Sequence, residues 1–182
     1  MDMMKGILKL YTVKSLSENE KKQVIKINLD NHVENGGQLR YKGILQHDFV
    51  VLAKLNHRVV GYVLLYKGFL DARDIYVMQV AIDKQYQHCG IGSKMYDYVY
   101  NHSKGFEVVT ANVNLSNIVS QKFHEKNGFT CCEKNNLGLV YAKVVEKYID
   151  KTFEDAKPIY FKSKRLMKKK PCKTIKKINC FR

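Results

Sequence analysis

The chain is poor in acidic residues and has no long apolar run. Asp and Glu number 17 against 32 Lys and Arg, which gives the 182 residues a net charge of +15. The longest apolar run, residues 59–66, is far short of the roughly 20 residues that span a membrane. Only a few apolar residues separate Lys5 from Lys9, so we expect no signal peptide. These absences predict a soluble, cytoplasmic protein with no membrane span.

Paired cysteines are missing as well. The five cysteines are Cys89, Cys131, Cys132, Cys172 and Cys180. They form no Cys-x-x-Cys pair and no cluster with histidine at the spacing of metal ligands, so we expect no metal site. An odd, scattered set of thiols is typical of a reducing compartment, which agrees with a cytoplasmic location.

The positive charge is concentrated towards the C-terminus. Residues 151–182 contain twelve Lys or Arg and two acidic residues, a net charge of +10. Residues 1–150 contain 20 Lys or Arg and 15 acidic residues, a net charge of +5. This predicts one globular domain over residues 1–150 and a basic extension over residues 151–182. Apolar residues 159–161, 166 and 167 could dock a short segment back onto the domain. The charged remainder is either a solubilising segment or a segment that binds nucleic acid through phosphate contacts.

One stretch combines a strand-like pattern with a glycine-bearing loop. An apolar run over residues 76–82 crosses a polar turn into residues 87–93, Gln-His-Cys-Gly-Ile-Gly-Ser, where a helical pattern begins. Glycine lets the backbone approach a ligand closely, and the first N–H groups of a helix are unpaired at the positive end of its dipole. The stretch therefore predicts a phosphate site. It does not match a P-loop, and Met95 stands where a dinucleotide fold needs its third glycine.

A second motif begins 25 positions after Gly92. It reads as a short helix over residues 117–127 that is closed by a glycine. Its register is carried by Asn117, Ser120, His124, Gly128 and Phe129. In this order and spacing, the two motifs resemble the acyl-CoA site of the GNAT family of N-acetyltransferases, and the resemblance covers about residues 49–145.

The resemblance implies an α/β fold with a mixed, mostly antiparallel central sheet and helices on both faces. It implies direct transfer of acetyl from acetyl-CoA, as co-substrate, to an amine. In the family, loop amides hold the CoA pyrophosphate, and backbone groups at the end of the central strand hold pantetheine and the oxyanion. The residues that this assigns to the site are Ala81, Ile82, Gln87, His88, Cys89, Gly90, Ile91, Gly92, Ser93, Asn117 and His124, with the oxyanion N–H near Ile82.

Two positions depart from the family pattern. His124 replaces a tyrosine that is proposed to protonate the CoA thiolate. An imidazole with a pKa near ~6.5 can carry a proton at neutral pH, so His124 is either the general acid or a packed histidine. Tyr76 replaces a glutamate that many members use as general base. Asp74 could point to the same face of the strand as Tyr76, but a turn residue is the favoured interpretation of Asp74. Deprotonation of the amine through water is an equal alternative.

The remaining patterns predict the elements around the site. A capping pattern from Ser17 to Glu20 starts a helix with Val24, Ile25, Asn28 and Leu29 on one face. Further strands are predicted over residues 7–13, 49–55, 59–66, 107–113 and 137–145, and a helix over 90–103. This helix carries a predicted core stripe made of Ile91, Met95, Tyr98, Val99 and His102. The loop after the first helix is expected over the acceptor site. Its candidate substrate contacts, which could equally be ordinary loop residues, are His32, Glu34, Gln38, Arg40 and Tyr41.

The sequence does not identify the acceptor amine. A small molecule or a protein is the leading prediction, and the basic balance also suits a charged tRNA or a nucleic-acid-associated protein. A third interpretation is a CoA-binding interaction module without chemistry, because the usual tyrosine and glutamate are both replaced. Either a monomer or a homodimer is expected.

Overall fold

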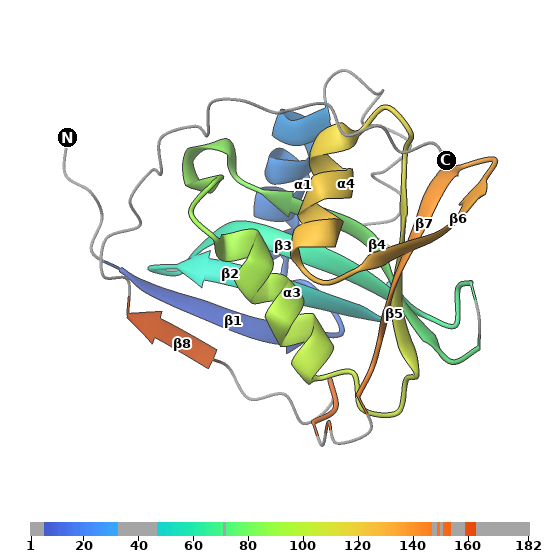
Figure 1. Cartoon of the computed structure of the whole chain (residues 1–182). Helices are drawn as coiled ribbons and strands as arrows, with labels where there is room; N and C mark the ends of the chain where they lie inside the picture. The colour runs from blue at the N-terminus through green and yellow to red at the C-terminus, as the bar shows by residue number, and fades with distance from the viewer. Residues whose placement is uncertain are drawn as a thin grey trace.

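The computed structural model describes residues 6–32, 47–70, 72–146, 149, 151–153 and, for the backbone, 159–162. These residues form an eight-stranded sheet in the order β6-β7-β5-β4-β3-β2-β1-β8 (Figure 1). The strands are β1 (Ile7–Val13), β2 (Phe49–Leu55), β3 (Arg58–Lys67), β4 (Asp74–Ile82), β5 (Val108–Val113), β6 (Thr130–Asn135), β7 (Gly138–Val144) and β8 (Ile159–Lys162). The helices are α1 (Glu18–His32), α3 (Ile91–Asn101), α4 (Ile118–Lys126) and a short 3-10 helix, η2 (Lys84–Tyr86).

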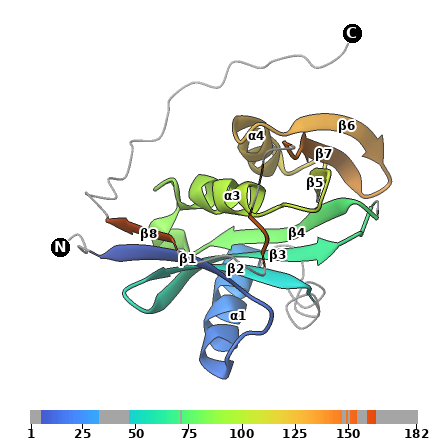
Figure 2. The same cartoon turned by 90° about the horizontal axis from the view of Figure 1, so that it is seen from below.

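The sheet is mixed and mostly antiparallel. β4 and β5 run parallel, and the other neighbouring strands of the described sheet pair antiparallel. α1 covers one face, and α3 and α4 lie on the other (Figure 2). The fold predicted from the two motifs is confirmed. Among the described residues, no helix combines the length and the apolar character needed to cross a membrane.

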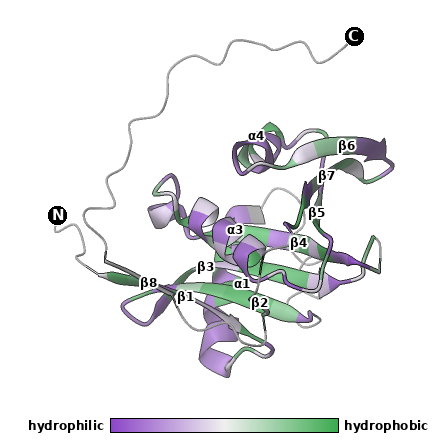
Figure 3. Cartoon of the chain, turned by 60° about the horizontal axis from the view of Figure 1, so that its bottom comes forward, coloured by the Kyte–Doolittle hydropathy of each residue, from purple (hydrophilic) through white to green (hydrophobic). Residues whose placement is uncertain are grey.

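Each face of the sheet carries its own apolar core. On the α3 side, the predicted stripe of Ile91, Met95, Tyr98 and Val99 is buried against β2 to β5. On the α1 side, Val24 and Ile27 pack against strand residues such as Tyr62 and Leu64. The hydropathy colouring follows this division, with the central strands apolar and the outer surface of α1 polar (Figure 3). The central strands are therefore covered on both faces, as their continuous apolar runs require.

The start of α1 follows the sequence pattern closely. The Ser17 N–H donates to the Glu20 carboxylate at 2.8 Å, and the Glu20 N–H donates back to Ser17 Oγ at 3.4 Å. This is the reciprocal capping box that the spacing predicted. The buried face differs in one residue, because Leu29 is 47% exposed whereas Ile27 is buried. Val24, Ile27 and Asn28 share the helix face because they are three and four residues apart.

Part of the basic extension belongs to the sheet. β8 pairs antiparallel with β1, with Ile7 opposite Lys162 and Leu10 opposite Ile159. Before it, Phe153 is buried and its ring stacks on Phe49 at a centroid distance of 5.0 Å. The predicted docking of residues 159–161 is confirmed, and the packed part of the chain continues past residue 150. Residues 163–182 lie outside the described residues.

The central strands separate towards one end. β4 pairs with β5 from Asp74 opposite Val108 to Val77 opposite Ala111. At the next residue, Met78, the register with β3 shifts, because Gln79 lies opposite Leu64 while Val77 lies opposite Leu65. Such a bulge bends the strand and increases its twist. Beyond it, β5, β7 and β6 turn away from the plane of β1 to β4 (Figure 3).

Candidate active site

A cavity of about 320 Å³ lies where β4 and β5 separate. Its walls come from both strands, from α3 and α4, and from the turn between β6 and β7. The lining residues are Leu64, Tyr76, Val77, Met78, Gln79, Val80, Tyr96, Ala111, Asn112, Val113, Asn114, Asn117, Ser120, His124 and Leu137. None of these described residues is Asp, Glu, Lys or Arg, so the cavity wall is uncharged when His124 is neutral.

The open half of β4 directs backbone groups away from β3. The Asp83 N–H donates to the Val60 carbonyl at 2.9 Å, so Asp83, Ala81 and Gln79 point their backbone groups at β3. The backbone groups of Val80 and Ile82 consequently face the side that β5 has left. This differs from the assignment of Ala81 to a ligand contact, because the Ala81 amide belongs to the β3 ladder. The residues of this segment whose backbone groups face away from β3 are Val80 and Ile82.

The loop after β4 presents the N-terminus of α3. His88 and Gly90 both have left-handed backbones, with φ of 62° and 78°. Gly90 is the N-cap of α3 and makes no side-chain capping hydrogen bond. The N–H groups of the first helical turn lack intrahelical acceptors by position, and they point out of the helix at the positive end of its dipole. The loop therefore has the geometry of an anion site.

Two side-chain contacts fix this loop to the rest of the site. Gln87 Nε2 donates to Asn31 Oδ1 at 2.7 Å and to the Ile82 carbonyl at 3.1 Å, so the loop is tied to α1 and to the end of β4. A Cβ on Gly92 would lie 3.1 Å from the Phe123 ring, which shows that α3 approaches α4 closely here. Gln87 thus acts as a tether, and a side chain on Gly92 would have to displace the Phe123 ring.

His124 lies on α4 and is 3% exposed. Its Nδ1 lies 2.8 Å from the Ser120 carbonyl oxygen and its Nε2 lies 2.9 Å from Tyr96 Oη. Burial lowers the pKa of His124, and the hydrogen bond to Ser120 only partly offsets this effect. The ring is therefore neutral at pH 7. His124 lines the cavity, but a general acid needs a proton that the resting Nε2 does not carry.

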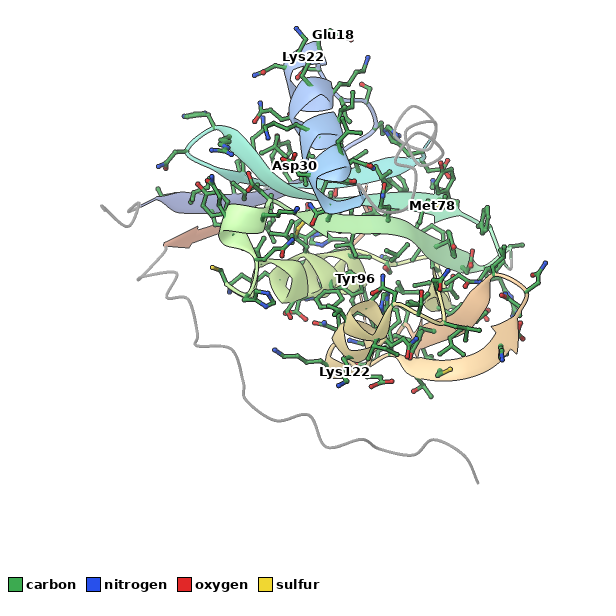
Figure 4. The ribbon with its side chains drawn as sticks, turned by 90° about the horizontal axis from the view of Figure 1, so that it is seen from above. Glu18, Lys22, Asp30, Met78, Tyr96 and Lys122 are labelled. Carbon is green, nitrogen blue, oxygen red and sulfur yellow. The ribbon has the colours of Figure 1, made fainter. Side chains whose placement is uncertain are left out.

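Tyr96 of α3 completes this corner of the cavity. Its side chain is 4% exposed, and its ring makes an edge contact with Phe123 at a centroid distance of 4.8 Å. Figure 4 places Tyr96 on the side of α3 that faces α4, with Met78 on β4 at the outer part of the site. Burial raises the pKa of Tyr96, so its hydroxyl is protonated and can donate a hydrogen bond. The helical stripe read from the sequence did not include Tyr96.

Asp74 is the first residue of β4, and its side chain holds the turn that precedes the strand. It is fully buried, and its carboxylate accepts hydrogen bonds from the Phe69 N–H, the Leu70 N–H and the Thr110 hydroxyl. These donors explain how the carboxylate tolerates burial. The strand thus begins at Asp74, one residue earlier than a turn residue would allow, while its carboxylate binds the backbone of the turn. Tyr76 lines the cavity and brings no carboxylate to it.

The other predicted contacts divide between the described residues and those outside them. Asn117 lines the cavity and caps α4 by accepting the Ser120 N–H at 3.0 Å. His32 is the last residue of α1. Glu34, Gln38, Arg40 and Tyr41 lie outside the described residues. No group of three or more His, Cys, Asp or Glu that could hold a metal ion occurs within the described ranges.

Comparisons with known proteins agree with this geometry. GCN5 from Tetrahymena has a similar structure, with a TM-score of 0.65 and 12% identity over 78% of this chain and 98% of that one. A GNAT-family acetyltransferase from Staphylococcus aureus Mu50 has a TM-score of 0.62 and 19% identity, over 75% of this chain and 99% of that one. PaiA N-acetyltransferase from Thermoplasma acidophilum was solved in complex with coenzyme A. It has a TM-score of 0.56 and 15% identity, over 74% of this chain and 98% of that one. No curated protein sequence matches the chain. The sequence model of the acetyltransferase (GNAT) family matches residues 19–129, and the chain therefore belongs to that family.

Proposed function

We propose that this acetyltransferase-family protein is an acetyl-CoA-dependent N-acetyltransferase that transfers acetyl directly to an amine. The observation that carries the proposal is the continuity of two features along β4. The strand lines an uncharged cavity over residues 76–80, and it ends in a loop that presents the N-terminus of α3. A thioester fits the first feature, and a pyrophosphate fits the second.

Each part of acetyl-CoA has a candidate partner. The amides of residues 87–93 would hold the pyrophosphate. The outward backbone groups of Val80 and Ile82 would hold the pantetheine arm and meet the oxyanion that forms when an amine attacks the thioester. Asn117 and His124 would line the thioester end, because both lie on the cavity wall. The pantetheine arm would thus lie beside the open half of β4, where β5 lies beside the paired half.

Calorimetric titration with acetyl-CoA and with CoA tests the binding site. Gly90→Glu should abolish binding because it places a carboxylate at the phosphate loop and strains the left-handed backbone. Gly105→Glu is the matched control, since Gly105 also has a positive φ, of 92°, and a Cβ there would also meet nothing within 4 Å. Binding lost in both variants would show that strain alone is responsible.

Turnover is tested separately by following CoA thiol release with a panel of primary amines. Acetylation of any of them would support the enzyme. Tight acetyl-CoA binding without turnover would favour the second candidate, a CoA-binding interaction module. The observation behind this candidate is that no carboxylate of the described residues lines the cavity. Such a wall offers no direct general base for an alkylammonium with a pKa near ~10.4.

Nucleic acid as acceptor, or as partner of the basic extension, is a related proposal. It is supported by the balance of +10 over residues 151–182. Retention of tRNA at low salt should fall steeply as salt increases if phosphate contacts are responsible. A chain shortened after Lys162 keeps β8 and removes much of the charge. Unchanged retention by this variant would count against a role for the extension.

A further inference from the structure

The contact between Tyr96 and His124 joins two neutral groups in a defined protonation state. His124 Nδ1 faces the Ser120 carbonyl oxygen at 2.8 Å, and a carbonyl can only accept a hydrogen bond. Nδ1 therefore carries the ring proton, and Nε2 has a free lone pair. Tyr96 Oη, 2.9 Å from Nε2, must then be the donor. The resting pair is thus arranged to accept a proton at Nε2 through the Tyr96 hydroxyl.

We propose that Tyr96 and His124 form a two-way proton relay, in which Tyr96 Oη meets the reacting groups and His124 stores the proton. The inference deepens the proposed function and rests on it. Both side chains line the cavity, and Tyr96 Oη covers the only ring nitrogen of His124 that is not bonded to the backbone. His124 therefore exchanges protons with the cavity through Tyr96. Tyr96 is the catalytic group, and His124 acts through it.

For an amine that enters the cavity in its neutral form, the relay balances the reaction without another acid or base. As the amine nitrogen forms its bond to the thioester carbon, its surplus proton passes to Tyr96 Oη. The original Tyr96 proton moves to His124 Nε2, which leaves an imidazolium with both nitrogens hydrogen-bonded. When the carbon–sulfur bond breaks, the proton returns from Nε2 to Tyr96 Oη, and Tyr96 gives its proton to the thiolate. The products are an amide and a thiol, and both side chains regain their starting state.

The surroundings of the pair favour transient charge on the imidazole over transient charge on the phenol. Tyr96 packs against Phe123 and Phe129, which offer no donor to a phenolate. The imidazolium would keep the Ser120 carbonyl as acceptor, with Ser120 Oγ 3.4 Å from Nδ1. A second titratable side chain, Tyr141 of β7, lies against the ring at a centroid distance of 5.4 Å, and its hydroxyl donates to Glu125 of α4 at 3.1 Å.

The protonation state can be measured without substrate. Two-bond nitrogen–proton NMR spectra of the full chain should show His124 at pH 7 as a neutral ring protonated at Nδ1. Tyr96→Phe should lower the pKa of His124 further, because the imidazolium would lose its hydrogen-bond acceptor at Nε2. A wild-type ring that is charged, or protonated at Nε2, would overturn the relay whatever the activity of the protein.

The kinetic test uses the amine of the panel that the wild type acetylates fastest. Tyr96→Phe should lower kcat by about 100-fold or more, with the Kd of acetyl-CoA nearly unchanged. Tyr98→Phe is the matched control, because Tyr98 is also buried on α3 but its hydroxyl contacts Thr12 instead of the cavity. Combining Tyr96→Phe with His124→Gln should cost no more than either change alone, since both break one relay.

The outcomes separate the relay from the proposed function. A wild type that fails to bind acetyl-CoA, or binds it and acetylates no amine, contradicts the proposed N-acetyltransferase activity. The NMR experiment still measures the protonation state of His124 in that case. A wild type that is active while Tyr96→Phe keeps at least half of its kcat contradicts the relay alone. Additive losses in the double variant, with an unchanged pH profile of kcat in each single variant, would indicate packing roles and also overturn the relay.

Discussion

The two halves of β4 have the same kind of sequence but different surroundings. From Asp74 to Val77 the strand is paired on both sides, with β3 and with β5. From Met78 to Ile82 it keeps β3 and loses β5. The paired half consists of buried side chains, whereas Met78 is 41% exposed and Val80 and Ile82 are partly exposed. Scaffold and candidate site are thus consecutive segments of one strand.

The difference shows that the candidate site arises where the pairing between β4 and β5 ends. The apolar residues of both halves would be equally compatible with a fully paired central strand. The bulge at Met78 bends β4, and the backbone groups of Val80 and Ile82 then face a cavity instead of a neighbouring strand. Substitutions in the paired half should therefore affect folding, whereas substitutions in the open half should mainly affect binding.

The largest effect is expected from Asp74→Ala in the paired half. Removing the carboxylate leaves the Phe69 and Leu70 N–H groups and the Thr110 hydroxyl without their acceptor, and we expect a loss of about 3 kcal/mol in the free energy of unfolding. Urea denaturation measures it. Asp48→Ala is the control, because Asp48 also accepts a strand N–H, from Lys67, but is exposed. Equal losses in both variants would contradict the special role of Asp74.

A smaller loss is expected from Gly61→Ala, opposite the end of the open half. The new Cβ would lie 2.6 Å from Ile82 Cδ1 and 3.3 Å from Met95 Sδ. We expect about 2 kcal/mol of destabilisation from this overpacking, with weaker acetyl-CoA binding because Ile82 must move. Adding Ile82→Val removes the clashing Cδ1 atom and should restore part of both losses. No recovery in the double variant would place the strain elsewhere.

Two neighbouring residues allow the comparison to be made at the bulge itself. Val77 is 4% exposed and ends the paired half, whereas Met78 is 41% exposed and begins the open half. Val77→Ala should cost about 1.5 kcal/mol of unfolding free energy. Met78→Ala should stay within about 0.5 kcal/mol although it removes more atoms. Thermal unfolding of both variants decides this, and a larger loss for Met78 would mean that the open half carries the fold.

The smallest effect concerns pH. Burial lowers the pKa of His124 below its ordinary value near ~6.5, so the unfolded chain takes up a proton before the folded one does. The stability that the neutral ring contributes is present above that value and is lost as pH falls below it. His124→Gln should make unfolding free energy less dependent on pH between pH 7 and pH 5, although His102, whose pKa burial also lowers, keeps part of the slope. An unchanged pH dependence in His124→Gln would contradict this expectation.

The fold was more predictable than the arrangement inside the site. Alternating and continuous apolar runs located β2 and β3, and the glycine spacing located the loop before α3, because these signals depend on neighbours in the sequence. The separation of β4 from β5 depends on a bulge that the residue types in this segment do not predict. The Tyr96–His124 contact joins α3 to α4 across 28 positions, so helical periodicity could not reveal it. The choice between Ala81 and Val80 needed the register with β3.

The strand β8 has a consequence for how the protein can be handled. By pairing with β1, it occupies backbone groups that would otherwise form an unprotected sheet edge on that side. Such edges recruit strands from other molecules, and β1 is an apolar strand of seven residues. β8 thus covers the backbone groups of β1 on that side of the sheet. A preparation ended at residue 150 to remove the basic residues would lose solubility by exposing β1.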